Sequence, residues 1–315
     1  MLWKTSAGSR SASTRQLSAK DSRMMKSNRI VLLDVGGTFV KSALGIAGKG
    51  AVEGSFMSTP ISSDGTAEEI TEAFRSAVAG QIGRAAEEGY AVEAVCAALP
   101  GPFDYKEGIF LMKHKFAAVY GSSFREILGD VISPETRLAF VHDVNGALLG
   151  ALSTDPSLRE GNVAMVTLGT GLGFTYAIDG EVQISETAPP AKGLWDAPYM
   201  GGILEEYVSR RGILRLYAEQ GGVLREGEDV KEVSIRARSG EEAALKAFAL
   251  AGSHLAAGAA QLISDLGIRQ IIFGGQISRS FDLMEESLLK GLPEGVNVKA
   301  SSDIEGLVLV GASAL

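Results

Sequence analysis

The chain has 315 residues, of which 45% are hydrophobic and 7% aromatic, enough for a sizeable apolar core. Its formal net charge of −8 argues against a nucleic-acid partner, and its single cysteine, Cys96, excludes an intramolecular disulfide and a Cys-based zinc cluster. The single cysteine fits a reducing, cytoplasmic location. No apolar run approaches the ~18 residues of a membrane helix, so we expect no membrane partner.

The first 29 residues differ in composition from the rest. They combine seven serines and seven Lys or Arg with one acidic residue, Asp21. This composition occurs in transit peptides and in basic arms that touch nucleic acid, and also in flexible tails. It would also be found if translation truly began at Met24 or Met25, so that the residues before it came from an upstream start codon. Because no apolar period precedes Met25, we expect residues 1–29 to be a disordered basic tail.

The hydrophobic pattern of the first half predicts alternating strands and helices. In chain order these are strands at 30–33, 39–46, 92–99 and 138–141, and helices at 66–82 and 144–152. Thr66 and Glu69 form the signature of a capping box at the start of the first helix. The glycine turn between the first two strands predicts that they pair antiparallel.

The second half begins in the same way and then becomes mostly helical. It predicts strands at 163–168, 174–178 and 270–273, and helices at 202–217, 241–266, 281–289 and from Gly306. The segments 34–38 and 167–171 both follow an apolar strand, carry glycines and a threonine, and lead into a second strand. This weak duplication predicts two similar α/β lobes facing a cleft, at 30–140 and 141–315, with the last helix able to pack back on the first lobe.

Three strand-to-glycine junctions in one acidic chain favour a nucleotide site, because bare backbone lets N–H groups approach phosphate oxygens. The third junction is Gly274–Gly275, and any single one of the three is equally well an ordinary turn. The chain has no G-x-x-x-x-G-K-[ST] loop, no kinase H-R-D with D-F-G, and no G-x-G-x-x-G that opens a helix. The motif at 34–38 is similar to the D-x-D-G-T of aspartyl-phosphate phosphatases, but Gly36 stands where the second Asp is needed.

Six motifs in order give the chain a family resemblance. They lie at 34–41, 99–102, 142–145, 167–173, 202–209 and 273–275. Together they resemble the ROK family of sugar kinases and repressors, from about residue 30 to the C-terminus. The resemblance implies two actin-like (ribonuclease H-like) lobes around a nucleotide and sugar cleft. It also implies a homodimer, ATP and Mg²⁺ as cofactors, and transfer of the γ-phosphate to a hexose or N-acetylhexosamine.

A sugar hydroxyl is a poor nucleophile, so a carboxylate must take its proton, and Asp143 is the candidate base. Its alternative role is the cap of the helix at 144. Asp34 is expected to orient Mg²⁺ through water, or else to accept an Asx-turn hydrogen bond. The expected phosphate and adenosine contacts are Gly36, Gly37, Thr38, Gly169, Thr170, Gly171, Gly274 and Gly275. Lys41 either neutralises phosphate charge or is a solvated lysine.

The resemblance also assigns the sugar site, with departures from the family pattern. It implies that His142, Asn145 and Glu205 contact the sugar, although His142 stands where the family usually has an asparagine. Equally, His142 is a structural histidine beside a strand end, and Glu205 is an exposed acid in the first turn of a helix, where the helix dipole stabilises it. Many members carry a zinc site of one His and three Cys, and residues 186–200 replace it here, so no zinc site is expected. In that segment, Glu186 is a candidate for the family glutamate that normally precedes the zinc histidine, and Trp195 either stacks on a sugar or fills the core.

The leading hypothesis from the sequence is an ATP-dependent, glucokinase-like sugar kinase. The alternative is a catalytically inactive sugar sensor or a transcriptional regulator of the same family. A regulator needs a helix-turn-helix domain of ~60 to 80 residues ahead of the lobes, whereas 29 unpatterned residues precede the first strand here. The missing zinc motif motivates the sensor, and the retention of both Asp34 and Asp143 argues against it.

Overall fold

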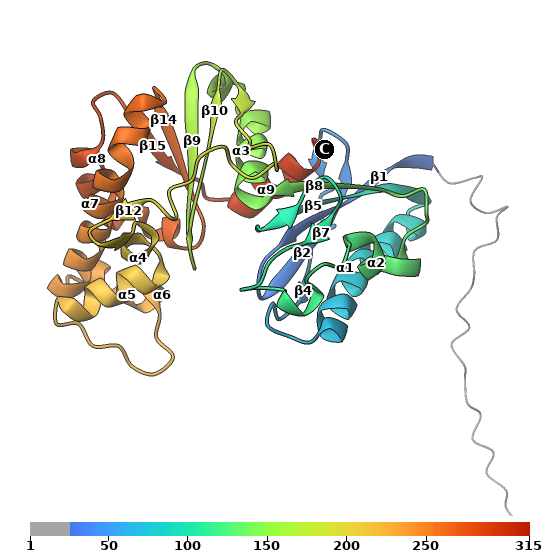
Figure 1. The fold of residues 1–315 in the computed structure, drawn as a ribbon, viewed down its shortest axis with the longest axis horizontal. Coiled ribbons are helices and arrows are strands. Elements are labelled where there is room, and N and C mark those ends of the chain that lie inside the picture. The colour runs from blue at the N-terminus through green and yellow to red at the C-terminus, as the bar shows by residue number, and fades with distance from the viewer. Residues whose placement is uncertain (1–25) are drawn as a thin grey trace, which may run out of the picture.

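Two β-sheets organise the computed structural model, which describes residues 26–315 (Figure 1). The first sheet has the order β3-β2-β1-β5-β8, with β4 also paired to β2, and the second has the order β11-β10-β9-β14-β15. The strands of the first sheet are β1 (Lys26–Val35), β2 (Phe39–Ile46), β3 (Gly50–Ala51), β4 (Met57–Pro60), β5 (Tyr90–Leu99) and β8 (Arg137–His142). Those of the second are β9 (Asn162–Leu168), β10 (Leu172–Ile178), β11 (Glu181–Val182), β14 (Gln270–Gly274) and β15 (Asn297–Ala300).

Helices and two small hairpins complete the fold. The hairpins are β6 (Phe103–Asp104) with β7 (Ile109–Phe110), and β12 (Pro198–Tyr199) with β13 (Gly202–Ile203). The α-helices are α1 (Ala67–Glu87), α2 (Phe124–Leu128), α3 (Asp143–Thr154), α4 (Glu205–Val208), α5 (Arg210–Glu219), α6 (Val230–Arg238), α7 (Glu242–Asp265), α8 (Glu285–Gly291) and α9 (Ile304–Ala312). The 3₁₀ turns within residues 26–315 are η2 (Ala117–Val119), η3 (Gly129–Val131), η4 (Pro156–Arg159) and η5 (Ile277–Leu283).

The two sheets have the same topology, which confirms the predicted pair of similar α/β lobes. In each sheet an antiparallel hairpin, β1–β2 or β9–β10, is joined by a glycine turn. A later strand, β5 or β14, pairs parallel to the first strand of the hairpin, and β8 or β15 then pairs parallel to that strand. Each lobe has its own apolar core cluster, the first under α1 and the second under α7.

Helices α3 and α9 pack against each other between the two sheets (Figure 1). They approach closely because Gly150 of α3 lies against the Leu307 carbonyl, and Gly311 of α9 lies against the Gly146 carbonyl. Helix α9 also contacts the first lobe, because Gly48 N–H donates to the Ser313 carbonyl over 2.7 Å. The last helix of the chain therefore touches both lobes.

The structure moves two predicted boundaries. Strand β1 begins at Lys26, paired with Tyr90 of β5, so residues 26–29 of the predicted tail belong to a strand. The other residues of that predicted tail lie outside the described residues. The first sheet continues to His142, paired with Leu99, two residues beyond the predicted end of the first lobe.

Two predicted helices are wrong in their extent. The segment predicted as one helix at 202–217 contains β13, α4 and α5, because Ser209 is extended and Arg210 N–H turns away to donate to the Gly169 carbonyl. The segment predicted at 281–289 is divided between η5 and α8, at Met284. Helix α6 was not predicted, although Asp229 and Glu232 form a capping box at its start.

One helix among the described residues, α7, is long and apolar enough to span a membrane by length and composition, with a mean hydropathy of 1.2. Its buried face packs in the core of the second lobe, through residues that include Phe248, Leu255 and Ile263. This is the arrangement of a core helix in a globular lobe.

Candidate active site

The start of α3 presents Asp143 beside the ends of several strands. Strand β8 ends at His142, and the helix begins at the next residue. Asp143 Oδ1 accepts a hydrogen bond from Val144 N–H over 2.7 Å and lies 2.9 Å from His142 Nδ1. The capping position belongs to His142, whose side chain makes no cap bond, so Asp143 is the first helical residue and not the cap of a helix at 144.

The local charges keep Asp143 ionised. Burial raises the pKa of this carboxyl, but the imidazole of His142, the Val144 N–H and the nearby Lys115 outweigh that effect and hold the pKa below its usual value. Its side chain is 41% exposed and therefore open to a ligand. Tyr105 packs against His142 with ring centroids 5.9 Å apart, and its hydroxyl donates to the Leu99 carbonyl. The Asp143 carboxylate is thus ionised and accessible, and the His142 ring beside it is held by packing against Tyr105.

Asp34, at the end of β1, lies close enough to Asp143 for the two charges to interact. Burial, above all, raises the pKa of Asp34 to about 6. The ammonium of Lys41 lowers this pKa, while the carboxylates of Asp143 and Glu305 raise it. Lys41 Nζ lies 3.6 Å from Asp34 Oδ2 and 2.6 Å from Glu305 Oε1, so Lys41 is ion-paired and not merely solvated.

Lys115 and Glu305 were not identified as site residues from the sequence. Lys115 lies before Phe116, whose N–H donates to the Ser63 carbonyl over 2.7 Å. Glu305 lies in the first turn of α9, near the C-terminus. No local pattern could have assigned either residue, because their partners Asp143 and Lys41 are distant in sequence.

The first glycine loop follows Asp34. Gly36 N–H donates to the Phe39 carbonyl over 2.9 Å, so it does not serve as the donor of an Asx turn from Asp34. Gly37 and Thr38 accept hydrogen bonds through their carbonyls from Ser63 N–H and Ile61 N–H, at 2.9 and 3.0 Å. Gly36 and Thr38 are exposed and Gly37 is half-buried. The loop is therefore fixed by neighbouring backbone while part of its surface stays open.

The second glycine loop is held by α5. Gly169 N–H donates to the Gly171 carbonyl over 3.1 Å, and the Gly169 carbonyl accepts from Arg210 N–H over 2.9 Å. A Cβ at Gly169 would meet nothing within 4 Å, and Thr170 is exposed. Gly173, just beyond the loop, approaches Val144 at the start of α3: a Cβ there would lie 3.5 Å from Val144 Cγ2. The start of α3 is therefore adjacent to this loop.

Glu205 is bonded to the second glycine loop. Its Oε2 accepts from Leu172 N–H over 3.0 Å, and its Oε1 pairs with Arg211 Nη2 at 3.0 Å. A Cβ at Gly171 would lie 2.7 Å from Glu205 Oε2, so a larger residue there would displace the Glu205 carboxylate. Glu205, the predicted sugar ligand, therefore lies against the backbone of this loop and holds it by a hydrogen bond.

Asn145 is fully buried. Its Nδ2 donates to the Ala188 carbonyl over 3.1 Å, and its Oδ1 accepts from Thr175 Oγ1 over 2.7 Å. These bonds fasten residues 184–190 to α3, and Ala188 also packs against the core cluster of the first lobe. In the same part of the chain Trp195 is 54% exposed, so it does not fill the core.

The third glycine junction is required by packing within the protein. A Cβ at Gly274 would collide with the Ile304 side chain of α9. Gly275 has a φ of +87°, and a Cβ there would collide with the Leu168 carbonyl at the end of β9. These contacts explain both glycines.

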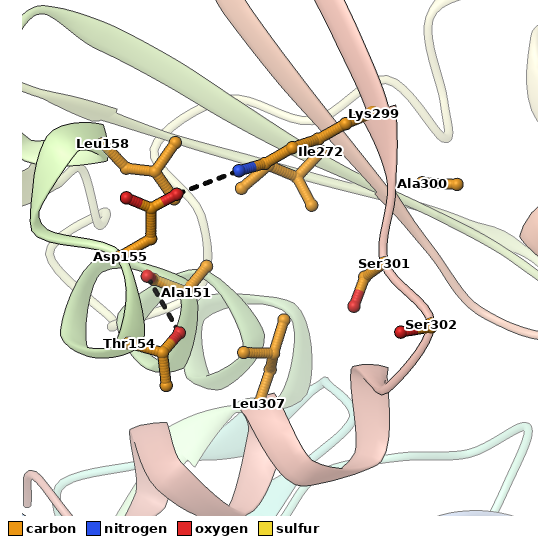
Figure 2. Close-up of a pocket in the computed structure, with 10 residues that line it drawn as sticks. All are labelled: Ala151, Thr154, Asp155, Leu158, Ile272, Lys299, Ala300, Ser301, Ser302 and Leu307. Carbon is orange, nitrogen blue, oxygen red and sulfur yellow. Dashed lines mark hydrogen bonds and ion pairs between the residues drawn. The ribbon is translucent and has the colours of Figure 1, made fainter.

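A cavity of about 250 Å³ lies between α3, α9 and the strands β14 and β15 (Figure 2). Lys299 Nζ and Asp155 Oδ2 pair across it at 3.1 Å, and Leu158, Ile272 and Leu307 provide apolar walls. None of the predicted site residues lines this cavity, so it is separate from the candidate active site.

Among residues 26–315, no group of three or more His, Cys, Asp and Glu side chains is arranged to hold a metal. In the segment that replaces the zinc motif, β12 carries Tyr199, whose hydroxyl lies 2.9 Å from His254 Nδ1. Tyr207 packs edge-on against the Tyr199 ring and at a tilt against the His254 ring. This aromatic cluster attaches the β12–β13 hairpin to α7.

The paired sheets, with α3 and α9 between them, define a two-lobed actin-like α/β protein, the architecture of ROK sugar kinase structures. The chain belongs to the ROK family, whose model matches residues 30–314, which confirms the resemblance found in the sequence. A glucokinase of Streptomyces coelicolor is 26% identical over 288 residues, covering 82% of this chain and 85% of the relative.

Two solved structures illustrate the range of similar proteins. A ROK family glucokinase from Streptomyces griseus, in complex with glucose and AMPPNP, aligns with a TM-score of 0.71 at 22% identity, covering 90% of this chain and 98% of that one. A ROK family transcriptional regulator, described as a homolog of the E. coli MLC protein, aligns at 0.70 and 18% identity, covering 91% and 78%. The relatives support sugar phosphorylation at the level of the family, which also includes regulators.

Proposed function

We propose that this protein transfers the γ-phosphate of ATP to a hydroxyl of a hexose or N-acetylhexosamine, as a glucokinase-like enzyme with Asp143 as general base. The observation that carries the proposal is the environment of Asp143. This carboxylate is ionised and exposed at the start of α3, 2.9 Å from His142 Nδ1 and adjacent to the second glycine loop. Its side chain is 41% exposed, so a substrate hydroxyl can reach it.

The base works in the following way. A sugar hydroxyl ionises far above neutral pH, so its proton must pass to Asp143 as the oxygen attacks phosphorus. In a loose transition state the attacking oxygen carries little new bonding until late, so a weakly basic carboxylate is sufficient. His142 contacts Asp143 and is proposed to hydrogen-bond a sugar hydroxyl.

The residues present fit Mg·ATP. The site holds more negative than positive charge: its carboxylates are Asp34, Asp143 and Glu305, and its ammonium groups are Lys41 and Lys115. A divalent cation would compensate this excess of negative charge. When bound, the ion neutralises phosphate charge, and Asp34 would hold it through water. The proposed phosphate contacts are Gly36, Gly37, Thr38, Lys41, Gly169, Thr170 and Gly171, with Gly274 and Gly275 beside the adenosine.

Glu205 and Asn145 act indirectly in this proposal. Their polar atoms are bonded within the chain, so contact with a sugar would need an exchange of those bonds. We propose that they hold the second glycine loop and residues 184–190 in place around the sugar. We also propose a homodimer, as the family resemblance implies. The acidic net charge, the single cysteine and the lack of a long apolar run support a cytoplasmic location without a nucleic-acid or membrane partner.

The test is ADP release from Mg·ATP with glucose, mannose, fructose, allose, N-acetylglucosamine and N-acetylmannosamine. Wild type is compared with Asp143→Asn and with the control Asp155→Asn, a carboxylate at the other end of α3. We expect turnover of at least one sugar, a fall in kcat of ~10²- to 10⁴-fold for Asp143→Asn with sugar affinity retained, and little change for Asp155→Asn.

Two outcomes would contradict the proposal. Full activity of Asp143→Asn would exclude this residue as the base. Absence of turnover with every sugar, despite binding of ATP and of a sugar, would favour the catalytically inactive sensor or regulator instead.

A further inference from the structure

One ammonium group is shared by two carboxylates in the candidate active site. Lys41 Nζ lies 2.6 Å from Glu305 Oε1 and 3.6 Å from Asp34 Oδ2. The side chains of Lys41 and Glu305 are 26% and 39% exposed, whereas that of Asp34 is 16% exposed. Lys41 is therefore drawn toward the more open carboxylate and away from the more buried one.

The carboxylate of Glu305 comes from a helix that is fixed at both ends. At the start of α9, Asp303 Oδ1 accepts from Gly306 N–H over 2.9 Å. After its end, Ser313 accepts hydrogen bonds from the N–H groups of Gly48 and Gly50, at 2.7 and 2.9 Å. Between these points α9 packs closely on α3, the helix that begins at Asp143. Glu305 is thus set in place by the same unit that presents the base.

We propose that Glu305 is a positioning residue that keeps Lys41 from closing on Asp34, so that its ammonium is directed toward the nucleotide phosphates. This inference rests on the proposed function. Lysine has a flexible four-carbon stem, and its ammonium follows the nearest negative charge. With Glu305 in place, Asp34 remains available to the hydration shell of a magnesium ion. Without it, Asp34 is the nearest carboxylate and takes Lys41 as its partner.

Charge alone predicts the opposite effect of removing Glu305. The phosphates of ATP are strongly negative, so the loss of a nearby carboxylate would strengthen ATP binding by reducing repulsion. The positioning role predicts weaker binding, because Lys41 is withdrawn from the phosphates and neutralises Asp34. The sign of the change therefore distinguishes the two effects.

The experiment measures the binding of Mg·AMPPNP by calorimetry, together with steady-state kinetics. For Glu305→Gln we expect Kd and the KM for Mg·ATP to rise roughly three- to tenfold, the size of coupling between groups in contact, with a smaller change in kcat and none in the sugar KM. Glu305→Asp, which keeps the charge, recovers part of the loss. Asp303→Asn removes a neighbouring carboxylate of the same helix but keeps a capping side chain, so Kd should stay unchanged.

A double-variant comparison connects the effect to Lys41. In a Lys41→Met background, Glu305→Gln should no longer weaken binding, because no ammonium remains to be displaced. The proposal is overturned if Glu305→Gln binds the analogue as tightly as wild type or more tightly, or if the weakening persists in the Lys41→Met background. It is also overturned if Asp303→Asn weakens binding equally.

The outcome for the proposed function is separate. If wild type binds the analogue but turns over no sugar, the kinase proposal fails while the binding measurements still test Glu305. If wild type does not bind the analogue, both proposals fail.

Discussion

Asp34→Asn should make the protein more stable at neutral pH while removing a residue proposed for catalysis. The folded state raises the pKa of Asp34 from 3.8 to about 6, chiefly by burial. Between these two values the folded protein binds more protons than the unfolded chain, so this group makes stability fall as pH rises. Above about pH 6 the full cost of burying the ionised Asp34 carboxylate lowers the stability of the folded protein. The pKa shift of ~2 units corresponds to about 3 kcal/mol of stability.

Asparagine has nearly the same shape and no charge, so it removes this penalty. Lys41 keeps Glu305 as its partner at 2.6 Å, and the substitution leaves no unpaired ammonium. We expect the free energy of unfolding of Asp34→Asn to exceed that of wild type by up to ~3 kcal/mol at pH 8. This difference should vanish near pH 4.

Thermal unfolding of the two proteins from pH 4 to pH 8, without nucleotide or magnesium, measures the difference. At roughly 2 to 4 °C per kcal/mol, the variant should melt several degrees above wild type at pH 8. Equal melting temperatures at every pH, or a difference that grows on acidification, would refute the reasoning.

Three further substitutions, one of them a control, test the packing of the protein. Gly150→Ala should lower the free energy of unfolding, measured with denaturant, by about 3 kcal/mol, because its Cβ would collide with the Leu307 carbonyl. The control Gly83→Ala in α1, where a Cβ meets nothing within 4 Å, should raise that free energy by up to ~1 kcal/mol. A Gly150→Ala protein as stable as wild type would contradict the close packing of α3 on α9. Tyr199→Phe should cost about 1 kcal/mol through the lost hydrogen bond to His254, measured in the same way, and an unchanged stability would show that this bond does not hold the hairpin.

Local signals in the sequence determined much of the architecture. The apolar runs before Asp34 and Gly169 gave the two glycine hairpins, and strand β2 has the predicted bounds, because alternation and glycine turns act over a few residues. The capping box of Thr66 and Glu69 is present as predicted at the start of α1. The repeated strand–glycine–strand pattern gave the two lobes, because each half follows the same local rules.

Only the tertiary structure decided what surrounds the candidate catalytic groups. Glu305 reaches Lys41 across almost the whole chain, and Glu205 is bonded to the second glycine loop, although both look like ordinary first-turn helix acids in the sequence. The break at Ser209 likewise depends on the distant Gly169 carbonyl. Local propensity determines whether a segment forms a helix, a strand or a turn. The hydrogen-bond or ion-pair partner of a side chain or backbone N–H depends instead on which distant segment the fold places beside it.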